Sequence, residues 1–519
     1  MIMNHSDVLK TDILVAGGGI AGYKAAVTAA KKGLEVLLVT KNTVTASEFV
    51  LGFNAVLSSE DSAQLYAEDT MSGGGNINNP DLVNVLATQS AVQVEETEAM
   101  GLEFDRADGE YDLMKPLGCT VPRLAHIKNY TGRLSLEKLR EEAGRLGVKI
   151  QTNIMLADVC VADGRVTGAV LYDLENKDVI NVQTKAVVIA TGGIHITDDS
   201  TYPVCMTGDG YGVAYRAGAQ LTDMEFLQFE PCRCIYPKKL GISTTLLAKG
   251  GIITNSDGER FLLSSYASEG DIPKNELAKL IYREIKAGKG TAHGGVYLDL
   301  TDVPREEIVE KHSLYYKRFM DAGIDITKEK IEVAPCPHSF MGGVVIDTDC
   351  SAAVDGMYVA GEAAGGIHGA NRVGGNAGTE IYVFGKIAGE SAAEYASKAD
   401  FELSQYPCDS GDYDADCQYF KGVKEKIYKI MSDYMGPVRD AYGLVAADEL
   451  LTGLCNDVSG ARARDFNALV VKKECENMLT VCMCACRAAI DRRESRGAHF
   501  RIDYPEKCYE YTRNFVHKK

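Results

Sequence analysis

The amino-acid sequence predicts an α/β protein whose first domain is discontinuous, with an inserted capping domain and a helical C-terminal domain. Apolar runs of strand length end in glycine-rich junctions at three places, residues 12–22, 186–193 and 356–362. A more highly charged stretch separates the last two junctions, and helical periodicity dominates from residue 401 to 493. We therefore expect a first domain over residues 1–236 and 336–400, a capping domain over 237–335 and a helical domain over 401–519.

The first junction has the pattern of a dinucleotide-binding loop. A short apolar run, a Gly-x-Gly-x-x-Gly loop, a helical pattern and a second strand follow one another over residues 12–16, 17–22, 23–32 and 35–40. Gly17 permits a tight turn, Gly19 lets a pyrophosphate approach the backbone, and Gly22 lets the helix pack against the strand. The amides of Ile20 and Ala21, at the helix N-terminus, are expected to face the phosphates. This context predicts a Rossmann-like domain.

The second strand lacks one feature of nicotinamide enzymes. It ends in Thr40 and Lys41, where such enzymes place the Asp or Glu that binds an adenosine ribose. The sequence therefore does not favour a simple nicotinamide dehydrogenase.

Further elements follow from periodicity. Apolar residues recur at helical spacing over 82–100 and 135–145, and residues 148–171 alternate in short runs with a turn at Asp163-Gly164. We expect two helices and a β-hairpin.

Composition excludes several functions. Lys plus Arg number 55 and Asp plus Glu 73, a formal charge of −18, and there is no long basic run, so nucleic acid and anionic membranes are poor partners. No uninterrupted apolar stretch reaches the roughly 18 residues of a membrane span, and the N-terminal residues do not have the pattern of a signal peptide. We expect no membrane insertion and a cytoplasmic location.

Fifteen cysteines first suggest a metal site, but their spacing does not support one. No Cys-x-x-Cys is present, and Cys475, Cys482, Cys484 and Cys486 fall on one predicted helix at a spacing that does not converge on a metal. We expect buried core thiols and no metal centre.

Nine stretches of the chain resemble the family of flavoproteins that contains fumarate reductase and succinate dehydrogenase flavoprotein subunits, L-aspartate oxidase and the adenylylsulfate reductase α subunit. In family order they are residues 15–22, 190–193, 207–210, 217–219, 223–226, 338–343, 361–363, 368–372 and 493–499. Of the last stretch, Arg493, Arg496 and His499, together with Arg501, are expected to form a structural polar network or a subunit contact.

The resemblance implies a bound FAD. The glycine loop would take the pyrophosphate, Asp209 and Glu362 would hold the cofactor, and the amides of Ala377 and Gly378 would face the flavin ring at a helix N-terminus. The full set of cofactor positions that the resemblance implies is Gly17, Gly19, Ile20, Ala21, Gly22, Thr40, Lys41, Ser47, Gly52, Ala157, Thr191, Gly192, Asp209, Glu362, Asn376, Ala377 and Gly378.

Respiratory members of the family attach FAD covalently through a histidine. Ala46 stands at that position here. We therefore expect a non-covalent flavin with a lower reduction potential, which suits a reductase or an oxidase better than a succinate dehydrogenase.

The family's substrate site is only partly present. His338 and Arg372 match the residues that grip a substrate carboxylate, although the same residues could be a core histidine and a structural ion pair. Glu230 replaces a family histidine, and Lys274 replaces the arginine that acts as general acid. Ser243, Thr244 and Leu247 align with the remaining substrate and proton-relay positions.

These departures disfavour fumarate and succinate. An ionised Glu230 would repel a second carboxylate, so a basic, hydroxylated or amino end would suit it better. Lys274 could deliver a proton if it is buried; otherwise it is a surface lysine and water supplies the proton.

The resemblance thus predicts a hydride transfer between flavin N5 and a carbon adjacent to a carboxylate-bearing centre, reducing an α,β-unsaturated acid other than fumarate. Two alternatives are an amino-acid oxidase similar to L-aspartate oxidase and a flavin-carrying chain that works with an iron–sulfur partner. In each reductase scheme an external electron donor is needed, such as a ferredoxin-like protein. Whether the chain forms oligomers is left open.

Overall fold

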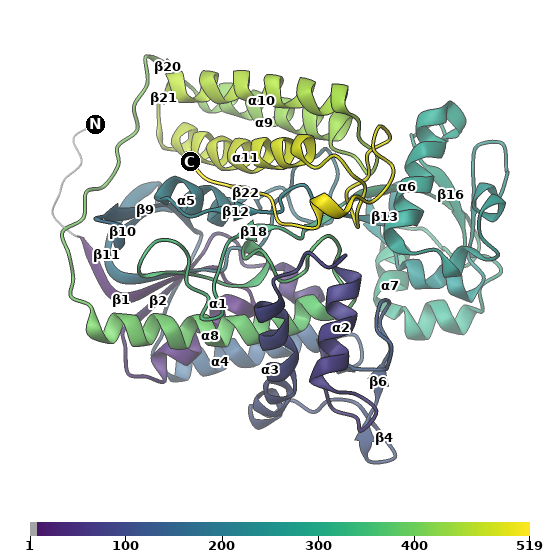
Figure 1. Ribbon diagram of the computed structural model, residues 1–519, viewed down its shortest axis with the longest axis horizontal. Coiled ribbons are helices and arrows are strands. Elements are labelled where there is room, and N and C mark those ends of the chain that lie inside the picture. Colours follow the sequence, from purple (N-terminus) through teal and green to yellow (C-terminus); the bar gives the residue numbers. More distant parts are fainter. Residues whose placement is uncertain (1–7) are drawn as a thin grey trace.

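A seven-stranded sheet forms the centre of the computed structural model, which describes residues 8–519 (Figure 1). Its strand order is β8-β2-β1-β11-β10-β9, and β19 also pairs with β11. The parallel strands are β1 (Leu9–Ala16), β2 (Val36–Thr40), β8 (Lys149–Thr152), β11 (Asp178–Ile189) and β19 (Met357–Val359). Strand β2 is buried along its whole length, as expected for an apolar strand covered on both faces.

The predicted hairpin is present. Strand β9 (Ile154–Ala162) pairs antiparallel with β10 (Arg165–Asp173), and Asp163 and Gly164 at the turn both have positive φ. Strand β10 in turn pairs antiparallel with β11, so the hairpin extends the main sheet.

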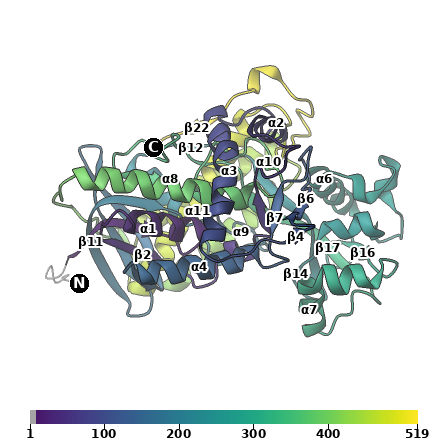
Figure 2. The same ribbon diagram turned by 90° about the horizontal axis from the view of Figure 1, so that it is seen from below.

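Helices cover one face of the parallel strands (Figure 2). Helix α1 (Ile20–Ala30) lies against α4 (Thr131–Arg145) and α8 (Asn376–Lys398), with α3 (Pro80–Ala99) and α2 (Ala63–Gly73) beyond. Glycines permit the close approach of α1 and α8, because a Cβ on Gly389 would stand 2.4 Å from the carbonyl oxygen of Ala25. The predicted helices over 82–100 and 135–145 correspond to α3 and α4.

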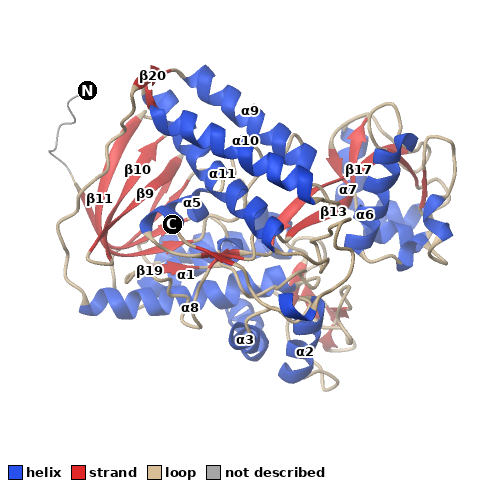
Figure 3. Ribbon diagram, turned by 45° about the horizontal axis from the view of Figure 1, so that its top comes forward, coloured by secondary structure: helices blue, strands red, loops and turns tan. Residues whose placement is uncertain are grey.

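The inserted segment has its own sheet and its own core. Its sheet, in the order β14-β13-β17-β16-β15, joins Leu240–Gly241, Leu227–Tyr236, Ile331–Phe340, Val296–Asp299 and Ile252–Thr254. Helices α6 (Lys274–Glu284) and α7 (Ser313–Asp321) pack on it, around a separate cluster of buried apolar residues that includes Ile281, Phe319 and Val333. The segment forms one end of the molecule, and β13 and β17 lead into it from the first domain (Figures 1 and 3).

The C-terminal part is helical, but it starts later than its periodicity predicts. Residues 401–412 have no regular structure and run along the main sheet to the short strand β20 (Tyr413–Ala415). The helices are α9 (Cys417–Tyr434), α10 (Ala441–Gly460) and α11 (Phe466–Asp491), which pack side by side above α5 (Asp209–Ala217). The chain then returns to the first domain, where β22 (Val516–His517) pairs with β12 (Leu221–Thr222).

The four clustered cysteines lie on α11, as predicted, and all are buried in the core. Burial raises the pKa of Cys475, Cys484 and Cys486 to about 12, so these groups are thiols at neutral pH. Over residues 8–519, no helix is both long enough and apolar enough to cross a membrane.

Candidate functional site

The glycine loop between β1 and α1 leaves one open side. Gly17 has a φ of 131°, and a Cβ there would stand 2.0 Å from the carbonyl oxygen of Ala190. A Cβ on Gly22 would stand 2.0 Å from the Gly17 carbonyl oxygen, so this glycine sets the packing of α1 on the loop. A Cβ on Gly19 would meet only the Ser47 hydroxyl, at 2.9 Å. Gly19 therefore faces the space where the sequence predicts the pyrophosphate.

Ser47 lies at the N-terminus of α1. Its Oγ accepts a hydrogen bond of 3.0 Å from the Ile20 amide, a donor that has no partner within the helix. The Ser47 hydroxyl therefore lies beside the α1 amides, where the resemblance predicts the cofactor phosphates.

Thr40 and Lys41 lie at the end of β2 and have different surroundings. The Thr40 side chain packs against Gly18, whose Cβ would stand 2.7 Å from its Oγ1. Lys41 Nζ lies 3.1 Å from Asp209 and 2.8 Å from Glu474. Burial alone would lower the pKa of Lys41, but the two carboxylates outweigh it and raise the pKa, so Lys41 is a cation held between β2, α5 and α11.

Asp209 is also fixed by neutral partners. Its Oδ1 accepts hydrogen bonds from Thr207 Oγ1 at 2.7 Å and from Asn477 Nδ2 at 2.9 Å. Arg216 donates to Asn477 at 2.7 Å and to the Ala157 carbonyl at 3.0 Å, which links Ala157 on β9 to this cluster.

Thr191 and Gly192 follow the end of β11. Thr191 Oγ1 accepts from the Gly210 amide at 3.0 Å, and Gly192 has a φ of 74°, a left-handed conformation that favours glycine. The end of β11 is thereby tied to the start of α5, near Asp209.

The N-terminus of α8 is tightly packed except at Ala377. Asn376 is buried and its side chain bonds with Asn54, Tyr66 and Thr70. The Gly378 amide donates to the Gly375 carbonyl at 3.0 Å, and its contact with the flavin ring stays a prediction of the resemblance.

Gly378 also has a packing role. A Cβ there would stand 2.3 Å from the Gly52 carbonyl oxygen, and Gly52 in turn closely approaches Ala125. Gly52 and Gly378 therefore bring β3 (Gly52–Asn54) into contact with α8, and Ala377, which is half-buried, is left to present its amide.

Glu362 follows β19 and its carboxylate points away from solvent. It accepts hydrogen bonds from the Tyr202 hydroxyl and from the Phe340 amide, the latter at 3.2 Å. Burial raises the pKa of Glu362 to about 7. A Cβ on Gly193 would stand 2.4 Å from this carboxylate, so the strand-to-loop junction after β11 borders Glu362.

Taken together, these positions fit a dinucleotide. The α1 N-terminus offers amides and the Ser47 hydroxyl, Gly19 leaves room beside them, and the α8 N-terminus offers the Ala377 amide. Such donors suit phosphate groups and an electron-rich ring.

His338 and Arg372 are in contact. Arg372 Nη2 lies 3.3 Å from His338 Nε2, 3.3 Å from Gln228 Oε1 and 3.5 Å from Ser339 Oγ. The other ring nitrogen of His338 lies 2.9 Å from Thr201 Oγ1. Burial, followed by the positive charges of Arg372 and Lys274, lowers the pKa of His338 to about 3.

His338 is therefore neutral at physiological pH. Neither Arg372 nor His338 has a carboxylate partner within residues 8–519, so Arg372 is not part of a structural ion pair. The arrangement leaves a cation and a neutral imidazole side by side, which suits an incoming carboxylate.

Glu230 and Lys274 form an ion pair beside these residues. Lys274 Nζ lies 3.0 Å from Glu230 Oε2, whereas the buried oxygen Glu230 Oε1 has no hydrogen-bond partner within residues 8–519. The Lys274 side chain is 45% exposed, so the burial required for an easy proton release is not found.

The other aligned positions have hydrogen-bond partners outside this group. Ser243 precedes the short helix η2 (Thr244–Lys249), and its hydroxyl bonds with Thr245 at 2.7 Å. In the described part of the chain, no hydrogen bond joins Ser243, Thr244 or Leu247 to His338 or Arg372.

Three site residues were not predicted from the sequence. Gln228 contacts Arg372, Thr201 contacts His338, and Tyr202 contacts Glu362. The signal for Gln228 was its position two residues before Glu230, which places both side chains on one face of β13. Thr201 and Tyr202 lie in a loop without regular structure and carried no such signal.

The predicted C-terminal polar network is present, but one of its arginines differs from the prediction. Arg496, His499 and Arg501 are buried in it, but Arg493 is exposed and Arg492 takes its place. Arg492 pairs with Glu225 at 2.5 Å and with Glu494 at 3.0 Å. The network joins the end of α11 to the first domain and does not include His338 or Arg372, as predicted.

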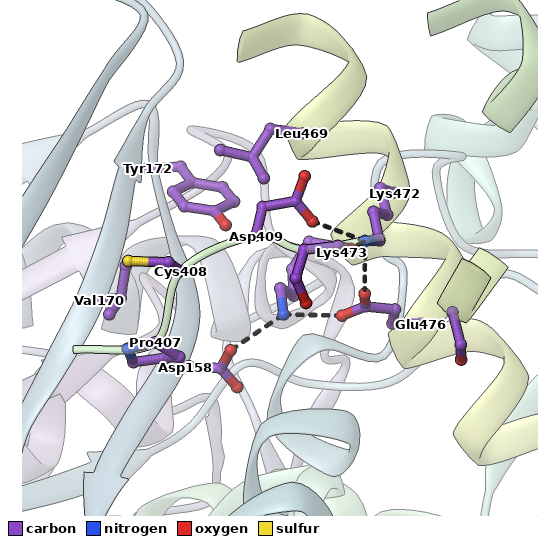
Figure 4. Close-up of a pocket in the computed structure, with 12 residues that line it drawn as sticks. Asp158, Val170, Tyr172, Pro407, Cys408, Asp409, Leu469, Lys472, Lys473 and Glu476 are labelled. Atoms are coloured by element: carbon purple, nitrogen blue, oxygen red, sulfur yellow. Dashed lines mark hydrogen bonds and ion pairs between the residues drawn. The ribbon is translucent and has the colours of Figure 1, made fainter. Parts of the chain in front are cut away.

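A separate cavity of about 230 Å³ lies between α11, the hairpin strands and residues 407–410 (Figure 4). Lys472 and Lys473 point into it, but Lys472 pairs with Asp409 at 2.6 Å and Lys473 with Asp158 at 2.9 Å. The charges of both lysines are thus already compensated by carboxylates that line the same cavity.

Comparison with known proteins defines the class of protein. Residues 12–377 match a family model described as an FAD binding domain, and residues 424–517 match one described as the fumarate reductase flavoprotein C-terminal region. The chain is therefore an FAD-dependent oxidoreductase.

The relatives define the family. An uncharacterized FAD-dependent oxidoreductase of Methanocaldococcus jannaschii is 34% identical over 98% of this chain and 96% of its own length. The fumarate reductase (CoM/CoB) of Methanothermobacter marburgensis contains a subunit that is 34% identical over 99% of this chain and 98% of its own length. The FrdA chain of an E. coli quinol fumarate reductase variant superimposes with a TM-score of 0.89 at 25% identity and covers 99% of this chain and 95% of its own.

This chain belongs to the family of fumarate reductase flavoproteins and L-aspartate oxidases. The predicted fold and the predicted FAD are thereby confirmed.

Proposed function

We propose that the protein reduces an α,β-unsaturated acid other than fumarate. The observation that carries the proposal is the contact of Arg372 with a neutral His338, 3.3 Å apart, where both side chains are half-buried and have no carboxylate partner in residues 8–519. Beside them lies the Glu230–Lys274 pair. Its Glu230 carboxylate would repel the second carboxylate of fumarate, which argues against fumarate as the substrate.

The chain's own residues have distinct parts in such a reaction. Arg372 binds the substrate carboxylate, and His338 donates a hydrogen bond to it in the tautomer whose proton is on Nε2, with Nδ1 accepting from Thr201 Oγ1. Negative charge developing on the acid is thereby stabilised. A bound FAD, once reduced by the external electron donor, would supply a hydride from flavin N5 to the carbon of the double bond near the carboxylate. Water supplies the proton to the adjacent carbon, because Lys274 is half exposed and paired with Glu230 and so lacks the burial that an easy proton release requires.

Substitution of Arg372 tests the proposal. Arg372→Leu should abolish reoxidation of the chemically reduced enzyme by unsaturated acids, while the purified protein keeps its yellow colour. Arg283→Leu, an exposed position on α6, is the matched control and should retain full activity. Retained turnover in Arg372→Leu would rule out this site.

A panel of acids identifies the reaction. We expect reoxidation of the reduced flavin by at least one unsaturated monocarboxylic acid and slow reoxidation by fumarate. Peroxide production in air with an amino acid as electron donor would instead favour an oxidase similar to L-aspartate oxidase.

We also propose that the FAD is not covalently bound. Ala46, which begins the short helix η1 (Ala46–Phe49), has no nucleophilic side chain where respiratory relatives of the family carry a histidine. Acid precipitation should leave the yellow colour in the supernatant. Colour that stays with the pellet would contradict the proposal.

An external electron donor completes the proposal. The sequence has no Cys-x-x-Cys, and the relative from Methanothermobacter marburgensis is named as one subunit of a reductase. We propose a ferredoxin-like or other iron–sulfur protein as the donor. When the tagged chain is purified from its native cells, a brown iron–sulfur protein should co-purify, and its reduced form should reduce and so bleach the flavin. Reduction of the flavin by a nicotinamide alone would contradict this proposal.

A further inference from the structure

We infer that Glu230 selects substrates whose end remote from the carboxylate carries a neutral hydrogen-bond donor, such as a hydroxyl group or a ring N–H. This inference rests on the proposed function, because it assumes that Arg372 and His338 bind the carboxylate. It names the chemical class of the acid, which the proposed function leaves open.

The strand geometry brings Glu230 to the same site as Arg372. Residues 228 and 230 lie on the same face of β13, and Gln228 Oε1 accepts from Arg372 at 3.3 Å. Strand β17 pairs with β13 and supplies His338, at an irregularity where Gln228 pairs with Ser339 and Phe229 with Pro337. Glu230 therefore stands one side-chain repeat, about 7 Å, along the strand from the carboxylate-binding group.

The oxygens of Glu230 are not equally satisfied. Lys274, the first residue of α6, binds Oε2 at 3.0 Å. Oε1 is buried and accepts no hydrogen bond from residues 8–519. A buried carboxylate oxygen without a donor is unfavourable, and a substrate group that donates to it would remove this cost.

The ion pair decides which kind of donor fits. Lys274 already neutralises the Glu230 carboxylate, so a cationic substrate end would place two positive charges around one negative group. A second substrate carboxylate has no proton to donate and would meet Oε1 as a like charge. A neutral O–H or N–H donor satisfies Oε1 without either penalty, which narrows the earlier expectation of a basic, hydroxylated or amino end.

Matched acids test the inference with the FAD-loaded enzyme. The reduced enzyme is reoxidised with 4-hydroxycrotonate against crotonate, and with 4-hydroxycinnamate against cinnamate. The hydroxylated acid of at least one pair should have a kcat/KM higher by about tenfold or more, as expected for a hydrogen bond to a charged acceptor.

Variants place the preference on Glu230. Glu230→Leu should reduce the preference to about onefold to twofold, because the acceptor is gone. Glu306→Leu, an exposed position of the inserted segment, should keep the full preference. Equal rates for both acids of each pair in the natural protein, or an unchanged preference in Glu230→Leu, would overturn the inference.

A binding measurement covers the case in which Glu230→Leu does not fold. In the natural enzyme, the flavin absorbance change on titration with 4-hydroxybutyrate should report an affinity about tenfold or more above that for butyrate. Equal affinities, or tighter binding of 4-aminobutyrate or succinate, would overturn the inference. Its failure is distinct from failure of the proposed function, which is decided by whether Arg372→Leu retains turnover.

Discussion

The ammonium group of Lys41 lies 2.8 Å from a carboxylate oxygen of Glu474, which joins the end of β2 to helix α11 across more than four hundred residues of sequence. The same group lies 3.1 Å from Asp209. Lys41, which the resemblance assigns to the cofactor site, therefore also links the C-terminal helices to the first domain by ion pairs.

Removal of this cation should destabilise the protein. Lys41→Met leaves Asp209 and Glu474 buried with less compensation, and the free energy of unfolding should fall by about 3–5 kcal/mol. Urea unfolding followed by circular dichroism measures this. The control is Lys31→Met, whose side chain is 53% exposed and 3.4 Å from Glu142; a loss as large in this variant would contradict the prediction.

Two glycines of the same loop should behave differently when replaced by alanine. Gly17→Ala places a Cβ 2.0 Å from a backbone oxygen and should yield little folded protein. Gly19→Ala meets only the Ser47 hydroxyl, so the chain should fold but bind FAD weakly. Circular dichroism and flavin content separate the two outcomes.

Gly144→Ala is the control for both replacements. Gly144 lies in α4 with nothing near its added Cβ, so the variant should fold and keep its flavin. Normal flavin content in Gly19→Ala would show that no cofactor group approaches this backbone position.

Ser47→Ala should weaken the N-terminus of α1. The Ser47 hydroxyl accepts the Ile20 amide at 3.0 Å, and loss of such a cap costs about 1 kcal/mol. We expect this decrease in the free energy of unfolding and a higher Kd for FAD, measured by titration of the flavin-free protein. Ser265→Ala, an exposed serine, should change neither quantity.

Glu362 should make stability depend on pH. Its pKa rises from an ordinary 4.5 to about 7 on folding, so its stabilisation is complete below pH 4.5 and is lost as the pH rises through 7. Between pH 5 and pH 8 the flavin-free protein should lose about 2 kcal/mol from this group.

The Glu362→Gln variant isolates this effect. It does not titrate, so its free energy of unfolding should fall by about 2 kcal/mol less than that of the natural protein between the two pH values. Glu390→Gln, an exposed position on α8, should retain the natural pH dependence. Identical pH profiles for the natural protein and Glu362→Gln would contradict the prediction.

Local patterns allowed much of the fold to be predicted. The Gly17–Gly22 loop was recognisable from the spacing of its glycines and the Asp163-Gly164 turn from its two residues, and the structure has both. The start of α9 was not predictable from periodicity, because residues 401–412 pack as an irregular segment along the sheet.

The side-chain partners of the site were not predictable to the same extent. The pairing of Lys274 with Glu230 depends on how α6 packs against β13, which no short sequence pattern encodes. Arg493 was expected in the network because the resemblance covers residues 493–499. Arg492, the first residue after α11, lies just outside that stretch and was overlooked.

The pairing of β12 with β22 has a consequence for synthesis on the ribosome. Asp223 bonds with Asn514, which is 291 residues further along the chain. At roughly 5–20 residues per second, the ribosome needs about 15–60 s to make that distance. During this interval Asp223 and Glu225, which end up fully buried, lack Arg492 and the C-terminal strand. The nascent first domain must therefore keep both carboxylates hydrated until the end of the chain has been made.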